Sequence, residues 1–241
     1  CLEYALVGRR RIKEQLKKIG GLEFYDVHFS YIDLEDGEER YVSTPENGGS
    51  TLIPEGELQA GSLYSIAHQP GDGHLGLVRL DLQVMPGAGK FTHTGFGSGS
   101  AISDELKEAV NYCRSNLSRI SQSARYAESE MHMKATDIHG IGTLEGLELG
   151  VFISLVSGLT QRPVQPQMCV LGSMSIGGTI IPTSDLAGAL QIAADAGAKR
   201  ILIPVADMMQ YSKVPADLIS KFSLEVYSDP VDATFKALGI K

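Results

Sequence analysis

The sequence has no tryptophan and only three cysteines, and these shortages narrow the kinds of site it can carry. Cys1, Cys113 and Cys169 are too few and too scattered for a disulfide framework or a zinc site. We therefore expect incidental thiols in a protein of the reducing cytoplasm. No stretch approaches the roughly 20 consecutive apolar residues that a bilayer requires, so we expect no membrane association.

Positive charge is scarce outside one short segment. The 241 residues carry 21 Lys and Arg against 29 Asp and Glu, a formal net charge of −8. Residues 1–20 hold six of the basic residues and only two of the acidic ones, which leaves the rest of the chain strongly acidic. An acidic body argues against nucleic-acid binding there. Arg9, Arg10 and Arg11 in the basic segment are candidate phosphate contacts, although such a segment is more often solvated surface.

The length and the hydrophobic content, 43% of residues, are ample for a folded core and exclude a disordered chain. Because the sequence begins at Cys1, we expect it to be a piece of a longer protein. Apolar spacing predicts a helix over residues 2–19. Residues 24–32 and 40–43 are rich in aromatic and β-branched residues, which predicts a hairpin.

The loop 44–56 is rich in turn-forming residues and is the expected boundary between a linking part, 1–56, and a main domain, 57–241. Helical and strand patterns alternate in the main domain. Strands are expected at 63–68, 75–85, 128–134, 167–176, 179–181, 200–204 and 224–227. Helices are expected near 103–120, 144–161, 184–196 and 215–221, and from residue 230 onward. The fold class is therefore α+β, with mixed sheets and packed helices preceded by a helix and a hairpin.

Details of these helices are also predicted. Asp104 and Glu105 are expected in the first turn of their helix, where the macrodipole favours negative charge. The helix at 144–161 is apolar nearly all round and should be central. Thr183 or Ser184 is expected to cap the next helix, with Asp185 in its first turn.

Common catalytic motifs are incomplete. The segment Pro86–Phe91 resembles a phosphate loop, but Val84 stands at the first glycine position and Phe91 at the hydroxyl position. No two histidines lie four residues apart on a helix, and no G-x-S-x-G elbow is present. A Ser–His–Asp site drawing on Asp137 and His139 stays open on residue types alone, although structural histidines are favoured.

Several segments together resemble a known family. The glycine-rich stretch 87–95 and the helix after it resemble the entrance of the proteolytic domain of Lon proteases. Residues 156–164 resemble the end of the Lon active-site helix, and residues 171–204 resemble the Lon stretch around its catalytic lysine. The resemblance covers about residues 60–241 in order. Residues 1–59 resemble more closely the Lon-related AAA+ proteins of BREX phage-defence systems.

That resemblance implies a serine–lysine dyad, in which a neutral amine takes the serine proton. Counted without gaps, the family's serine position is Gly146, and with a two-residue shift it is Glu148. The family's lysine position is Ala187. The resemblance therefore implies a degenerate site without catalytic residues, and its expected lining is Asp137, His139, Gly146, Glu148, Ser184 and Ala187.

The sequence thus favours a degenerate Lon-protease-like domain, a pseudo-protease that serves as a structural module of a ring-forming AAA+ phage-defence protein in the cytoplasm. Two alternatives remain: an active ATP-dependent Lon-type serine peptidase with an unrecognised nucleophile, such as Ser184, and a DNA-binding module acting through Arg9, Arg10 and Arg11. We expect no cofactor and no metal in this chain. The resemblance implies ATP, magnesium, ring assembly and DNA contact for the longer protein.

Overall fold

The computed structural model describes residues 29–32, 39–42, 52–71, 73–97 and 100–240. The chain divides into two compact units, Cys1–Glu46 and Asn47–Lys241. In the first unit, β1 (Phe29–Ile32) and β2 (Glu39–Val42) pair antiparallel, which confirms the predicted hairpin. The predicted helix at 2–19 and its three arginines lie outside the described residues.

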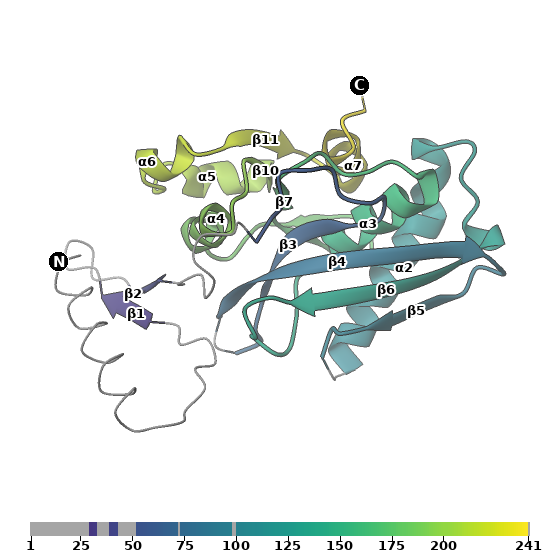
Figure 1. Ribbon diagram of the computed structural model, residues 1–241, viewed down its shortest axis with the longest axis horizontal. Helices are drawn as coiled ribbons and strands as arrows, with labels where there is room; N and C mark the ends of the chain where they lie inside the picture. The colour runs from purple at the N-terminus through teal and green to yellow at the C-terminus, as the bar shows by residue number, and fades with distance from the viewer. Residues whose placement is uncertain (1–28, 33–38, 43–51, 72, 98–99, 241) are drawn as a thin grey trace. The chain divides into compact units, whose positions relative to one another are not determined.

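The second unit is built on a seven-stranded sheet in the order β11-β10-β7-β3-β4-β6-β5 (Figure 1). Its strands are β3 (Leu63–His68), β4 (Leu75–Pro86), β5 (Phe91–Thr94), β6 (Ser129–Asp137), β7 (Met168–Val170), β10 (Arg200–Pro204) and β11 (Ser223–Tyr227). Strand β4 pairs antiparallel with both of its neighbours, and every other pairing is parallel. Six strands therefore run in one direction and end at one edge of the sheet. A separate antiparallel pair is formed by β8 (Ser173–Met174) and β9 (Ile180–Ile181).

The α-helices and 3₁₀-helices of the described residues connect these strands. The α-helices are α2 (Ser100–Ile120), α3 (Glu148–Thr160), α4 (Leu186–Asp195), α5 (Met208–Tyr211), α6 (Ala216–Ile219) and α7 (Pro230–Ala237). The 3₁₀ turns are η1 (Tyr126–Glu128) and η2 (Val205–Asp207). Within the described segments, none of the helices combines the length and apolarity that crossing a bilayer demands.

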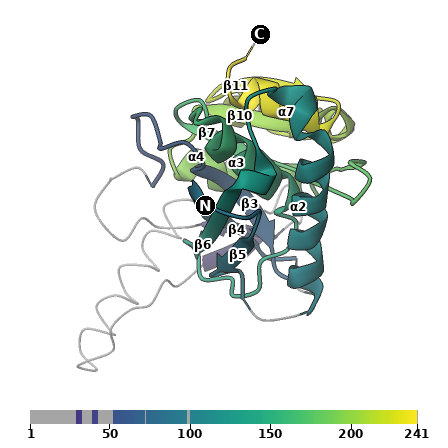
Figure 2. The ribbon, with the colours of Figure 1, turned by 90° about the vertical axis from the view of Figure 1, so that its right-hand side faces the viewer.

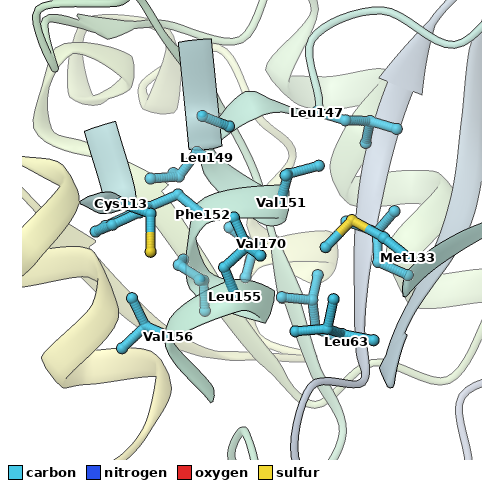
Figure 3. Packing of buried hydrophobic residues seen from close by; sticks show 14 of the residues in the cluster. Leu63, Cys113, Met133, Leu147, Leu149, Val151, Phe152, Leu155, Val156 and Val170 are labelled. Atoms are coloured by element: carbon cyan, nitrogen blue, oxygen red, sulfur yellow. The ribbon is translucent and has the colours of Figure 1, made fainter. Parts of the chain in front are cut away.

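Helix α3 is buried between the sheet and two other helices. Every residue of α3 from Glu148 to Gly158 is buried, and α3 packs against α2, α7 and β4. Figure 3 shows Leu149, Val151, Phe152, Leu155 and Val156 of this helix among side chains of the sheet and of α2. The prediction of a central apolar helix is confirmed, because such a helix can bury apolar surface on all sides.

The opposite face of the sheet has its own apolar cluster. Alternating residues of β3 point to the two faces, so Leu63 belongs to the α3 side and Tyr64 to the other side. On that second side, Leu186, Ala189 and Leu190 of α4 pack against the sheet. In Figure 2, α2 lies along one side of the strands and α4 lies toward the other. The mixed sheet with packed helices confirms the predicted α+β class.

Three local predictions are corrected. Helix α2 begins at Ser100, three residues early, so Asp104 and Glu105 lie beyond its first turn. The strand predicted at 167–176 is interrupted after Val170, where Gly172 has a φ of +89° and turns the chain. Within the glycine-rich stretch, residues 91–94 form β5, an edge strand that the turn-forming composition concealed.

The cap of α4 is also corrected. Asp185, and neither Thr183 nor Ser184, is the N-cap, because its side chain accepts a hydrogen bond from the Gly188 N–H at 2.9 Å. Ile53 is buried, and its N–H donates to the Ala196 carbonyl at 2.9 Å, so chain before residue 57 joins the second unit. The functional division into 1–56 and 57–241 stays a prediction.

Candidate functional site

Polar residues from several strands lie at or just beyond the carboxyl-end edge of the sheet, among them the predicted site residue Asp137. His68 ends β3, Asp137 ends β6, and Asp207 follows β10 by three residues. These strands all run in the same direction, so their carboxyl ends lie at one edge. Ligands of open parallel sheets bind at such an edge. A ligand-binding or catalytic site is therefore expected at this edge.

One of the two candidate serine positions lies just ahead of α3. Gly146 has a φ of +80°, in the left-handed region that favours glycine. A Cβ at this position would lie 2.8 Å from both Cε1 and Nδ1 of the His68 ring. Glu145 and His68 exchange backbone hydrogen bonds of 3.1 Å, which ties the loop to the end of β3. The backbone at Gly146 therefore disfavours any residue with a side chain, serine included.

The other candidate position is occupied by a buried acid. Glu148 is the first residue of α3 and is 8% exposed, and its Oε2 has no hydrogen-bond partner in the described structure. Burial, followed by repulsion from Glu108 and Glu145, raises the pKa of Glu148 to about 7. A carboxyl group at this position can carry a proton but cannot replace serine as an acyl-forming nucleophile that water regenerates.

Glu148 belongs to a group of four acids that we call the glutamate cluster: Glu105, Glu108, Glu145 and Glu148. Burial, with repulsion from its three neighbours in the cluster, raises the pKa of Glu105 to about 8. The backbone N–H of Gly146 near the Glu105 carboxyl group partly offsets this rise in pKa. Next to the cluster, His68 Nε2 lies 3.7 Å from Glu145 Oε2.

The lysine position lies at the same edge of the sheet but on the opposite face. Ala187 is in the first turn of α4 and has no ionisable group. Ser184, two residues before that helix, is exposed. Neither of the described cysteines is a candidate nucleophile, because burial raises the pKa of Cys113 and of Cys169 to about 12. Asp207 is fully buried and accepts a 3.0 Å hydrogen bond from the Thr183 N–H, which holds the start of α4 against the end of β10.

Two histidines that the sequence offered for catalysis, His139 and His132, have structural partners. His139 Nδ1 accepts a 2.8 Å hydrogen bond from the Leu77 N–H. The Asp137 carboxylate accepts hydrogen bonds of 2.8 Å from the N–H groups of Gly140 and Gly142, which shapes the loop after β6. His132 Nδ1 lies 2.9 Å from Thr92 Oγ1, between β6 and β5. In these contacts the His139 ring pairs with a backbone N–H and the His132 ring pairs with a threonine.

The sequence-based reasoning missed Glu105, Glu108, Glu145 and His68. The only available signal was the repeated i, i+3 spacing of glutamates, at 105 and 108 and again at 145 and 148. Because that spacing is common on solvated helix faces, it gains meaning only once α2 is known to pack on α3. Within the described segments, no group of three or more His, Cys, Asp or Glu side chains is arranged to hold a metal ion.

The comparisons with known proteins agree with this fold. The family described as Lon protease (S16) C-terminal proteolytic domain matches residues 53–238. Over 240 residues, all of this chain, the sequence is 47% identical to the Lon-like protease BrxL of Escherichia coli O9:H4 (strain HS), covering 34% of that protein. It is 46% identical to the Lon-like protease BrxL of Bacillus cereus (strain H3081.97), again over all of this chain and 35% of that protein.

Lon proteases of other organisms are less similar to this chain. The Lon protease of Methylocella silvestris is 30% identical over 164 residues, which is 64% of this chain and 19% of that protein. The chain therefore belongs to the family of Lon protease C-terminal proteolytic domains, which confirms the resemblance found in the sequence. It spans about a third of the length of its BrxL relatives.

Proposed function

We propose that this member of the Lon proteolytic-domain family has lost peptidase chemistry and acts as a structural and assembly module of a longer, ring-forming protein. The observation that carries the proposal is the carboxyl-end edge itself. It has a left-handed glycine and a buried glutamate where the family's nucleophile is expected, and Ala187 where the amine is expected.

These replacements have a large kinetic consequence. A serine and its base act as a unit, and removing either lowers the turnover rate by about a millionfold in comparable hydrolases. Ser184 is exposed and precedes α4, and in the described structure no lysine forms a hydrogen bond with it. We therefore assign no nucleophile to this domain.

An exposed apolar surface supports the assembly role. Thr183 N–H binds Asp207, and Gln210 Nε2 donates to the Thr183 carbonyl at 2.9 Å, so the exit of β9 is held against η2 and α5. Large apolar side chains close in sequence to these contacts are exposed: Ile181 46%, Val205 55%, Met208 42% and Met209 86%. We call these four residues the apolar surface. Clustered exposed apolar residues commonly mark protein contacts, and a second copy of this chain is the occupant we propose.

A degradation assay tests the loss of peptidase activity. The 241-residue chain is incubated with unfolded casein, with and without ATP, beside a Lon protease as positive control. The proposal expects casein to remain intact with the chain and to be degraded by the control. Casein fragments that disappear when Ser184 is replaced by alanine would instead establish the alternative, an active peptidase.

Sedimentation velocity tests the assembly role. We expect the chain to associate as its concentration rises, and Met209→Glu to weaken this association by about tenfold or more, because a charge would have to be buried in the contact. Met85→Glu is the matched control, since Met85 is 42% exposed at the end of β4, outside the apolar surface. A chain that stays monomeric at all concentrations would contradict the assembly role.

The remaining roles belong to the longer protein. We propose that it takes part in BREX phage defence, binds ATP and magnesium through other segments, and contacts DNA mainly outside this chain. Two observations support these roles. The chain is 46–47% identical to BrxL proteins about three times as long, and Val84 and Phe91 occupy the positions where a phosphate loop has glycine and a hydroxyl residue.

A further inference from the structure

The glutamate cluster combines two acids of α2 with two acids at and just before the start of α3. Glu105 and Glu108 lie three residues apart on α2, and Glu145 and Glu148 lie three residues apart across the start of α3. Glu105 and Glu108 share one face of α2 because of this spacing, whereas Glu145 lies in the loop before α3, bridged to His68, and α2 packs directly on α3. Glu105 interacts electrostatically with each of the other three acids, so the four carboxyl groups form one group rather than two separate pairs.

The cluster has no strong cation of its own. Among the described residues, none of its four glutamates forms an ion pair with a lysine or an arginine, and only His68 pairs with Glu145. The nearest lysine along α2, Lys107, pairs instead with Asp104 at 2.8 Å, and both side chains are 67% exposed. Four carboxyl groups gathered without a partner destabilise the fold unless they hold protons or receive a cation.

A second observation points to a ligand. Glu148 is more than nine-tenths buried, and its Oε2 accepts no hydrogen bond in the described structure. Buried polar atoms are nearly always hydrogen-bonded, so the unpaired Oε2 of Glu148 is an acceptor that a bound ligand could supply with a donor. The three other acids are only partly buried, and the Glu145 side chain is 23% exposed, so a donor can approach from solvent.

We propose that the glutamate cluster binds the guanidinium group of an arginine side chain presented by a protein partner. A guanidinium has five N–H donors in a planar fork that pairs with carboxylates through two hydrogen bonds, and it keeps its charge in a partly buried site. An inorganic cation fits less well, because these side chains do not form a metal-binding group. The inference deepens the proposed function and rests on it, since a working peptidase would use this edge for chemistry.

Calorimetry of the 241-residue chain tests the inference, with acetyl-Gly-Arg-Gly-amide as the probe. The matched ligand contains citrulline, which has nearly the shape of arginine without its charge. We expect the arginine peptide to bind at least about tenfold more tightly than the citrulline or lysine peptide, as fits a charged fork. Binding at pH 7 should also release protons, because the cation favours ionised Glu105 and Glu148, so the measured enthalpy should vary with the ionisation enthalpy of the buffer.

Variants locate the binding. Glu148→Gln should weaken binding of the arginine peptide about tenfold or more, and Glu108→Gln provides a second test on the other helix. Glu128→Gln makes the same change of charge on an exposed side chain of η1 and should leave binding unaltered. The inference is overturned if the arginine peptide does not bind, if citrulline or lysine binds as tightly, or if Glu148→Gln and Glu108→Gln leave binding unchanged. These outcomes are independent of casein degradation, which tests whether the domain is a peptidase.

Discussion

At the scale of single residues, Glu148 combines burial with a missing hydrogen-bond partner. The unfolded chain ionises this carboxyl near its ordinary pKa of 4.5, whereas the folded protein holds the proton until about pH 7. Between these values the unfolded state binds fewer protons, so the free energy of unfolding falls as pH rises. Glu105 acts in the same direction up to about pH 8.

Replacing Glu148 by glutamine should remove the contribution of this residue to the fall in unfolding free energy at higher pH. We expect Glu148→Gln to stabilise the protein at pH 8 by about 1–3 kcal/mol more than at pH 4.5. Urea unfolding at the two pH values measures the difference. Glu128→Gln, an exposed control, should give the same small effect at both, and a pH-independent effect of Glu148→Gln would refute the burial argument.

Gly146 is the residue at which backbone geometry opposes a side chain. With a φ of +80° and the His68 ring 2.8 Å from an added Cβ, Gly146→Ala should lower the free energy of unfolding by about 1–2 kcal/mol. Gly56→Ala is the control, since no atom lies within 4 Å of its added Cβ. Equal effects of the two substitutions in chemical denaturation would show that Gly146 is unconstrained.

At the scale of elements, the N-cap of α4 can be assigned to Asp185 or to Ser184 by comparing two substitutions. Asp185→Ala removes the side-chain acceptor of the Gly188 N–H and should cost about 1 kcal/mol of unfolding free energy. Ser184→Ala should change it by less than about 0.5 kcal/mol, because Ser184 is exposed. A larger loss at Ser184 than at Asp185 would show that the N-cap is Ser184, one of the two residues that the sequence predicted, and not Asp185.

Elements with strong local patterns were predictable, and elements decided by tertiary contact were not. The apolar run of α3 and the start of α7 at Pro230 are local, and in the structure Asp229 accepts hydrogen bonds from the N–H groups of Val231 and Asp232. Strand β5 forms because its backbone pairs with β6. This long-range contact cannot be predicted from a glycine-rich stretch. The glutamate cluster depends on α2 packing on α3, which no spacing within either helix specifies.

At the scale of the whole molecule, the parallel strands bring separate segments to one edge. Asp137, the loop before α3 and the start of α4 all lie at the carboxyl ends of strands, as the predicted site requires. The sequence predicted this gathering only through the resemblance to Lon proteases. The assignment of the family's serine and lysine positions to Gly146 or Glu148 and to Ala187 stays a prediction, and the burial of Glu148 and its acidic neighbours required the structure.

The central claim is that this Lon-type fold carries no reactive serine. The most direct measurement is the intact mass of the chain after incubation with a serine-reactive fluorophosphonate, beside a serine hydrolase that becomes labelled. The account predicts an unchanged mass for the chain, because Gly146, Glu148 and Ala187 leave no activated hydroxyl group. A single added phosphonyl group, located on Ser184 or any other serine, would contradict it.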